Sequence, residues 1–216
     1  MQHKSKKDVY MKKLLVLFLL VISVNCMAQI ETGLLIGGGI GNVTNTSLRL
    51  SDPGVIQTLE KSGKYSLNYQ FNTTLGYRFR LYNPKHKTFF YDLDVLTGIK
   101  KIELKTSFSD ETNALSEVKS SDWFCPVSLA ASVNYRIMKG LYVGVGVAPT
   151  CIFASKIAFD IPIVAKVGYD IKNKIGFSLS YQHSLLKAFK TDEYDGGRFS
   201  EWNVSVYIPF TLNKLK

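Results

Sequence analysis

The stretch SLNYQFNTTLGYRFRLY (residues 66–82) separates its side chains by odd and even position. One parity carries Leu67, Tyr69, Phe71, Thr73, Leu75, Tyr77, Phe79 and Leu81, and the other carries Asn68, Gln70, Asn72, Thr74, Gly76, Arg78 and Arg80. Successive side chains of a β-strand point to opposite faces, so this alternation predicts one long strand with an apolar and a polar face. The direction in which the apolar face points decides what kind of protein this is.

The same alternation recurs along the whole chain after its first residues. It predicts eight strands, at residues 30–42, 66–82, 89–103, 123–137, 141–153, 159–171, 175–181 and 202–212, and no helix. The chain of 216 residues is 46% hydrophobic and holds 12 Tyr and 13 Phe, which suits one folded domain.

The predicted connections alternate in length. Short turns are expected around residues 83–87, 138–140 and 172–174, whereas long polar loops are expected at 43–64 and 106–121, with a mid-sized acidic one at 190–197. The link at 154–156 is the exception, because it is short although it lies at the end where the other connections are long. Short turns at one end, long loops at the other and an even strand number predict an eight-stranded antiparallel up-and-down transmembrane β-barrel.

The composition of the two faces indicates that the apolar face points outward to lipid. Its central positions carry aliphatic residues without charge, and a charge there would cost about 2 to 4 kcal/mol. Aromatic residues gather at its ends, as they do at lipid interfaces: Phe79, Phe89, Tyr91, Tyr135, Tyr169, Phe177 and Phe210 near the short turns, and Tyr69, Phe71, Trp123, Phe153, Phe159 and Trp202 near the long loops. The alternative is a soluble lipocalin-like barrel, but that fold would place the apolar face inside and a charged surface outside.

The polar face carries nearly balanced charges, which suits an enclosed interior. It holds Arg78, Arg80, Lys100, Arg136 and Lys166 together with Glu31, Asp92, Asp94, Asp160, Asp170 and Glu201. If Leu81 pairs with Phe89, Arg78 lies opposite Asp92. Because eight strands leave room only for side chains, and Tyr142 and Tyr207 also point inward, we expect a plugged polar core without a wide pore.

Residues 1–28 have the pattern of a secretory signal peptide. Lys12 and Lys13 precede an apolar run at 14–24, and small residues place the cleavage after Ala28. Met11 is a candidate start, which would make residues 1–10 an upstream extension; a lipoprotein signal ending at Cys26 is the competing interpretation. Without five lysines and one aspartate of the leader, the formal charge falls from +10 to +6. Nucleic-acid binding is not expected, since no basic helix or basic-aromatic motif occurs.

With this leader and strand pattern, residues 29–216 resemble the small outer-membrane β-barrel (porin-like) family of Gram-negative bacteria. The resemblance rests on GLLIGGGIGN (residues 33–42), LYVGVGVAPT (141–150) and VSVYIPF (204–210). It implies an envelope protein of the cell outer membrane, in contact with the lipid bilayer and lipopolysaccharide and inserted by the barrel-assembly machinery. The chain departs from the family in continuing beyond Phe210 to Lys216, where the last strand usually ends the chain.

Three groups of residues are candidates for chemistry. The glycines Gly37, Gly38, Gly39 and Gly41 lack the spacing of a phosphate-binding loop. Adjacent His183 and Ser184 would point to opposite faces of a strand and cannot act as base and nucleophile; the resemblance to barrel lipid deacylases fails at this spacing. The loop acids Asp192, Glu193 and Asp195 are either solvated or a divalent-cation site shared with lipopolysaccharide phosphates.

The mature chain keeps two cysteines, Cys125 and Cys151. If Ile137 pairs with Leu141, the two thiols become diagonal neighbours on the lipid face, about 7 Å apart. That distance is at the limit for a disulfide, so we expect free thiols.

The sequence therefore predicts a non-enzymatic outer-membrane barrel without cofactor or metal, whose loops serve envelope structure or a surface interaction. A small porin-like channel and an accessory subunit of a secretion system are the alternatives.

Overall fold

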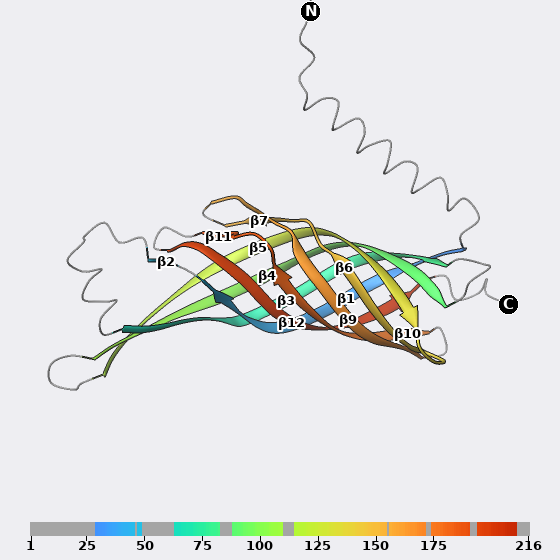
Figure 1. Ribbon diagram of the computed structural model, residues 1–216, viewed down its shortest axis with the longest axis horizontal. Coiled ribbons are helices and arrows are strands. Elements are labelled where there is room, and N and C mark those ends of the chain that lie inside the picture. The colour runs from blue at the N-terminus through green and yellow to red at the C-terminus, as the bar shows by residue number, and fades with distance from the viewer. Residues whose placement is uncertain are drawn as a thin grey trace, which may run out of the picture.

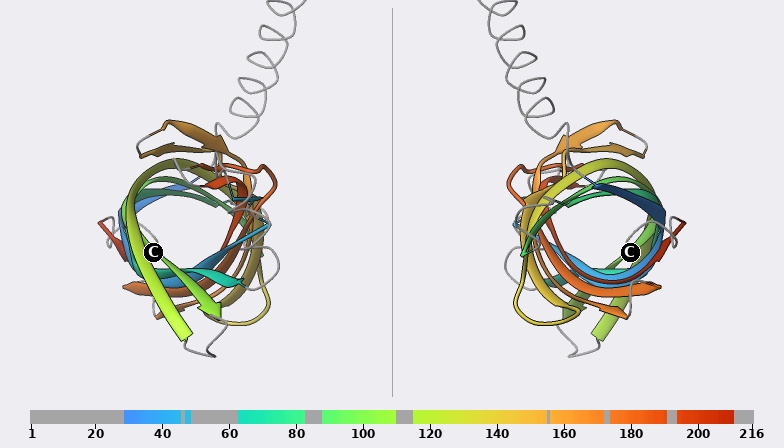
Figure 2. Two further views of the ribbon diagram at one scale, coloured as in Figure 1. Left: turned by 90° about the vertical axis from the view of Figure 1, so that its left-hand side faces the viewer. Right: turned by 90° about the vertical axis from the view of Figure 1, so that its right-hand side faces the viewer.

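The strands of the protein close into one antiparallel β-barrel. The computed structural model describes residues 29–45, 47–48, 63–82, 88–109, 115–154, 156–171, 174–190 and 194–210. Seen along its axis, the barrel is a closed ring of strands (Figure 2). Within these ranges there is no helix long and apolar enough to cross a membrane. The predicted leader, residues 1–28, lies outside the described part of the chain.

The ring has eight strand positions, which follow one another in chain order as predicted. We call each position a stave, because two of the eight are made of two short strands in succession. They are β1 (Gln29–Thr44), β3 (Gly63–Tyr82), β4 (Phe89–Ser109), β5 (Leu115–Arg136), β6 (Leu141–Val147) with β7 (Thr150–Phe153), β8 (Ala158–Asp160) with β9 (Pro162–Ile171), β10 (Ile175–Ser184) and β12 (Tyr194–Pro209). Each stave pairs antiparallel with the next, and β12 pairs with β1 from Gly33↔Pro209 to Thr44↔Arg198, which closes the barrel.

Two staves are interrupted by prolines. The register is the same on both sides of the interruption, with Val147↔Ile163 in β6 and β9 and Thr150↔Asp160 in β7 and β8. Pro149 lies within the break between β6 and β7, and Pro162 is the first residue after the break between β8 and β9. A proline has no N–H to donate to the ladder. Each pair of elements therefore forms one stave with a local break.

The strands extend farther toward the long-loop end than the sequence predicted. β4 and β5 stay paired as far as Ser109↔Leu115, so most of the expected loop at 106–121 is a projecting hairpin, visible at the left of Figure 1. Two short strands, β2 (Ser47–Leu48) and β11 (Phe189–Lys190), pair with the start of β12. The apolar alternation ends where a strand leaves the hydrocarbon, but the backbone ladder continues in water, so the loop prediction was too long.

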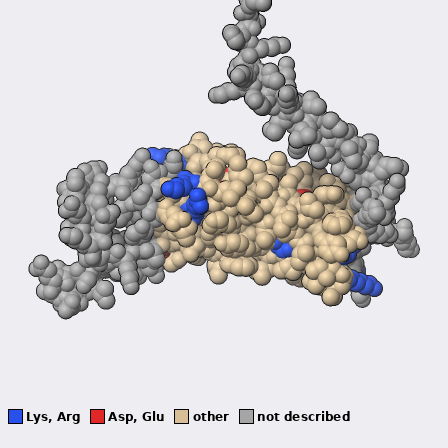
Figure 3. Space-filling view, viewed as in Figure 1, with Lys and Arg blue, Asp and Glu red and all other residues tan. Residues whose placement is uncertain are grey.

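The apolar face points outward, as predicted. Val145 and Val204 in the middle of the wall are 64% and 58% exposed, and Leu75, Val95 and Leu129 are exposed as well. The face seen in Figure 3 carries only scattered charged side chains. The eleven charged residues expected on the inner face are all buried or half-buried.

Two belts of exposed aromatic side chains flank this aliphatic band. All seven aromatic residues predicted near the short turns are exposed. Of the six predicted near the long loops, five are exposed, namely Phe71, Trp123, Phe153, Phe159 and Trp202. The sixth, Tyr69, is only 8% exposed and points inward, so its assignment to the belt was wrong.

A β-bulge explains the inward direction of Tyr69. In the pairing of β3 with β4, Tyr69 is opposite Ile102 and Phe71 is opposite Lys101, which leaves Gln70 as an extra residue. One extra residue exchanges the faces of a strand. Leu67 and Tyr69 therefore line the interior, while Phe71 and the residues after it keep the predicted orientation.

Candidate functional site

The interior of the short-turn half is held by two arginines opposite two aspartates. Arg78 is paired with Asp94 and Arg80 with Asp92 in the β3–β4 ladder. Both Nε and Nη2 of Arg78 donate to Asp94 at 2.7 and 2.8 Å, and Arg80 Nε donates to Asp92 at 2.7 Å. Arg78 was expected opposite Asp92, so the predicted register was off by two residues. Arg78 Nη1 nevertheless lies 3.7 Å from Asp92. A shift of two leaves every side chain on its face.

Further charges from across the lumen complete what we call the ion cluster: Arg78, Arg80, Asp92, Asp94, Arg136, Lys166 and Asp170. Lys166 Nζ lies 2.7 Å from Asp92, and Arg80 Nη1 lies 3.1 Å from both oxygens of Asp170. Arg136 Nη2 lies 3.4 Å from the same carboxylate. Buried Glu31 in β1 is opposite Arg80 and adds a fourth acidic side chain beside the cluster. The ion pairs join β3, β4, β5 and β9, and so tie opposite walls together.

Aromatic rings enclose the ion cluster. The Arg80 guanidinium lies 4.6 Å from the ring centre of Phe90, 5.0 Å from that of Tyr207 and 5.3 Å from that of Tyr142. A side chain on Gly168 would overlap the Tyr142 ring, so the glycine makes room for the aromatic residue. As predicted, Tyr142 and Tyr207 point inward, and together with Phe90 they enclose the Arg80 guanidinium.

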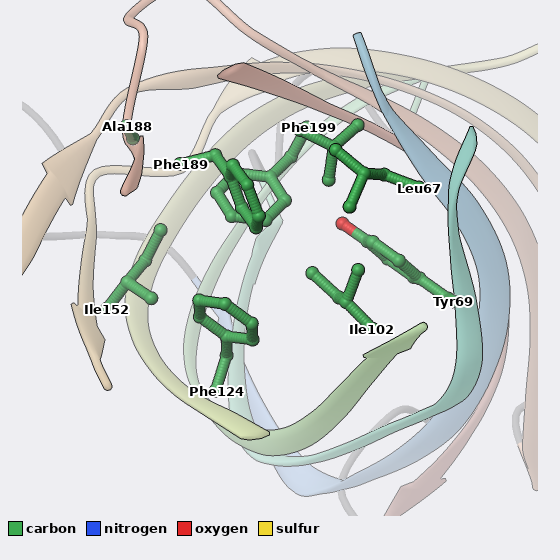
Figure 4. Close-up of a cluster of buried hydrophobic side chains, with 9 residues drawn as sticks. Leu67, Tyr69, Ile102, Phe124, Ile152, Ala188, Phe189 and Phe199 are labelled. Atoms are coloured by element: carbon green, nitrogen blue, oxygen red, sulfur yellow. The ribbon is translucent and has the colours of Figure 1, made fainter. Parts of the chain in front are cut away.

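An apolar group that the sequence analysis missed fills the opposite end of the lumen. We call it the mouth cluster: Val43, Leu67, Tyr69, Ile102, Phe124, Ile152, Ala188, Phe189 and Phe199 (Figure 4). The rings of Phe124, Phe189 and Phe199 lie 5.6 to 6.2 Å apart. Phe124, Ile102 and Ile152 occupy polar-face positions close to the long loops, and those apolar residues were the available signal. Phe189 comes from β11, outside the predicted strands.

Two small cavities lie within the barrel, and both have Thr74, Leu96 and Gln182 in their walls. Each has a volume of about 50 Å³, enough for about three to five water molecules. One lies beside Arg78 and Lys166, and the other lies beside Phe124, Phe199 and Lys100. The Lys100 ammonium is 2.6 Å from Glu201. The interior is thus a short polar space between the ion cluster and the mouth cluster.

His183 and Ser184 point to opposite faces, as predicted. Ser184 is buried, donates to Asp160 and accepts a hydrogen bond from the backbone N–H of Phe199 at 3.1 Å. His183 faces outward, and its Nδ1 lies 2.7 Å from Ser200 Oγ on β12. This cross-strand pair was not predicted.

The predicted diagonal placement of the two cysteines on the outer face is confirmed. Cys125 is opposite Phe153 and Cys151 opposite Val127, and both are exposed free thiols on the outer face. Of the loop acids, Asp192 and Glu193 lie outside the described residues. Across the part of the chain that is described, no group of three His, Cys, Asp or Glu residues is placed to hold a metal ion.

These features define the class of protein. A closed antiparallel barrel of eight staves has an aliphatic band between two aromatic belts outside and paired charges inside. This is the inverse of a soluble barrel and is the arrangement of a transmembrane β-barrel of the outer-membrane type. The expected fold class is therefore confirmed.

Comparison with protein-family models gives no match, and neither does comparison with curated protein sequences. Solved structures similar to this chain include Neisserial surface protein A, at 12% identity and a TM-score of 0.44, covering 85% of this chain and 99% of that one. Ail, the attachment invasion locus protein of Yersinia pestis, solved with the heparin analogue sucrose octasulfate, has 13% identity, a TM-score of 0.41 and coverages of 84% and 99%. The outer membrane protease OmpT from Escherichia coli has 8% identity, a TM-score of 0.38 and coverages of 85% and 96%.

Proposed function

We propose that this protein is a non-enzymatic barrel of the Gram-negative outer membrane, with a role in envelope structure or surface interaction. The observation that carries the proposal is the filled lumen. The ion cluster ties the walls together at one end and the mouth cluster fills the other. A closed interior leaves the outward surface and the loop end as the parts that can meet partners.

The predicted leader and the apolar outer surface support insertion in the outer membrane. Short turns of such barrels face the periplasm, so the short-turn end would lie there and the β4–β5 hairpin would project from the cell. In this setting the aliphatic band contacts the lipid bilayer, the outer aromatic belt meets lipopolysaccharide, and the barrel-assembly machinery inserts the chain.

Two measurements on the full chain test the proposal. Folded barrels resist detergent, so outer-membrane fractions should show a band whose migration changes on boiling. Purified protein in planar bilayers should give no stable conductance. A band restricted to the soluble or inner-membrane fraction would contradict the location, and steady channel openings would contradict the closed lumen.

The absence of enzymatic activity needs its own test, because His183 and Ser200 form a hydrogen-bonded pair on the lipid face. Purified protein should leave phospholipid and lipid A intact over long incubations. Hydrolysis that disappears in Ser200→Ala, but persists in the control Ser180→Ala, would overturn the non-enzymatic proposal and place a nucleophile on β12.

A small channel is the second candidate, and the two interior cavities favour it. Their walls have three residues in common, so a polar space already spans part of the lumen. If the protein is a channel, neutralising Asp92 with Asp92→Asn should change the ion selectivity of its conductance, whereas Asp122→Asn at an exposed position should not.

A further inference from the structure

The barrel wall has one interruption beyond the end of β10. The β9–β10 ladder ends at Ser184↔Pro162, followed by one long hydrogen bond of 3.4 Å from Leu185 N–H to Ile161. Past that point β8 pairs with β7 alone, and β11 pairs with β12 alone. Among the described strands, none pairs with the second edge of β8. The β7–β8 hairpin and β11 lie on the same side of the barrel (Figures 1 and 2).

A cavity lies directly behind this interruption and takes its walls from both sides of it. Thr150, Ile152 and Asp160 line it from the β7–β8 hairpin, and Ser184 and Phe199 line it from β10 and β12. The volume of about 50 Å³ has room for an ammonium group and its first methylenes, in place of about three to five waters. Moving β8 away from β11 would open this cavity sideways, since no ladder joins β8 to β10 or β11 among the described strands.

The cavity contains a carboxylate that lacks a cationic partner. Asp160 is 1% exposed and accepts hydrogen bonds from Ser184 Oγ and from the N–H of Ile161. No lysine, arginine or histidine of the described residues forms an ion pair with Asp160, and Lys100 in the same cavity is paired with Glu201. Buried charges are normally compensated. Among the described residues that line the cavity, two carboxylates, Asp160 and Glu201, are present with one cation, Lys100.

The surroundings of the interruption are apolar, while the routes along the barrel axis are blocked. Ile157, Phe159, Leu185 and Leu186 are exposed beside it and are 41% to 75% accessible. The mouth cluster closes the lumen above the cavity, and the ion cluster closes it below. A ligand reaching Asp160 would come from the hydrocarbon of the outer leaflet, with an apolar tail.

We propose that this cavity binds the primary ammonium group of an alkylamine amphiphile, which reaches it sideways between β8 and β11. The ammonium group would pair with Asp160, the faces of Phe124 and Phe199 would add cation–π contact, and the alkyl chain would lie against Phe159 and Leu185. The amine can belong to an amino headgroup of a lipid or to a free alkylamine. This site is a binding function beyond the proposed envelope role.

Binding of radiolabelled dodecylamine to the full chain in phosphatidylcholine nanodiscs tests the charge requirement. Empty nanodiscs give the background, and dodecanol is the neutral competitor. We expect saturable binding that dodecanol does not displace, weakened about tenfold or more by Asp160→Asn. Asp122→Asn, an exposed carboxylate, should bind as the wild type does. Binding that is absent, or equally strong in Asp160→Asn, would overturn the proposal.

A second measurement keeps the proposal testable if Asp160→Asn does not fold, and it uses one protein in two states. The substitutions Ile161→Cys and Leu185→Cys, in a background with Cys125→Ser and Cys151→Ser, place one thiol on each side of the interruption. Oxidation would join the two thiols in a disulfide that holds the interruption closed. Dodecylamine should bind the oxidised barrel at least about tenfold more slowly and recover its rate on reduction. Equal rates in both states would exclude sideways access. Detergent resistance of both states, measured in parallel, separates this outcome from a failure of the barrel itself.

Discussion

Arg80 Nε lies 2.7 Å from Asp92 Oδ1 inside the barrel, and these side chains are 1% and 2% exposed. The pair spans β3 and β4, and Arg80 also reaches Asp170 on β9, across the lumen. Two charges of such low accessibility are stable only together. Arg80 therefore connects β3 with β4 and with β9 on the opposite wall.

Replacing Arg80 should destabilise the barrel strongly. In Arg80→Met the carboxylates of Asp92 and Asp170 lose their closest arginine, and removal of one partner from a buried pair costs about 3 to 5 kcal/mol. The free energy of unfolding in urea, measured from lipid vesicles, checks this. The exposed control Lys139→Met should change it by less than about 0.5 kcal/mol. Equal effects of the two substitutions would show that the ion cluster contributes no stability.

Removing the acid as well should recover part of the loss. In the double variant Arg80→Met with Asp92→Leu, the carboxylate that lost its closest arginine is itself removed, and apolar replacement of a buried pair is often tolerated. Lys166 loses its 2.7 Å partner Asp92 in this variant, so the recovery should be partial. The double variant should unfold at a higher urea concentration than Arg80→Met alone. Strict additivity of the two single effects would contradict the direct coupling of these residues.

A charge on the outer surface should also be costly, for a different reason. Val145 faces outward in the middle of β6, where Val145→Arg would place a guanidinium in hydrocarbon at about 2 to 4 kcal/mol. The yield of heat-modifiable barrel in vesicles reports the effect. Val145→Leu is the matched control and should fold normally, whereas tolerance of arginine would mean that this surface is in water.

The mouth cluster should control access from the loop end. Ser128 lines the cavity below Phe124, and Ser128→Cys in a background without Cys125 and Cys151 gives a reporter thiol. Phe189→Ala removes a ring packed on Phe124 and Phe199, so a charged thiol reagent should label the reporter about tenfold faster or more. Leu179→Ala, at an exposed position on β10 away from the proposed sideways entrance, is the control. Unchanged labelling would show that Phe189 does not close the lumen.

Most of the wall was predictable from the sequence because period-two alternation is local and the barrel repeats it. The alternation identified eight staves, the outward direction of Val145 and the inward direction of Tyr142. The β3–β4 register was predicted only to within two residues, since a shift of two preserves both faces. The pairing of Cys125 with Phe153 was predictable because the tight turn at Met138 to Gly140 fixes the register.

The mouth of the barrel could not be predicted in the same way. The bulge at Gln70 turns Leu67 and Tyr69 inward, and an extra residue in one strand leaves no mark in an alternating sequence. Phe189 reaches the lumen through a hairpin between β11 and the start of β12, in a part of the chain where no strand was predicted. The contact between Ser184 and Asp160 likewise depends on how three strands meet, so it follows from tertiary structure alone.

The orientation of the two faces is tested most directly by spin labels at Val145→Cys and Ser132→Cys in vesicles, without the native cysteines. Ser132 is opposite Gly146, next to Val145, so both labels lie at one depth in the wall. Oxygen, which dissolves in hydrocarbon, should increase the relaxation rate of the label at 145, and a water-soluble nickel chelate should not. Oxygen should increase the relaxation rate of the label at 132 only slightly. Strong nickel relaxation at 145, with oxygen relaxation at 132, would contradict a lipid-embedded barrel.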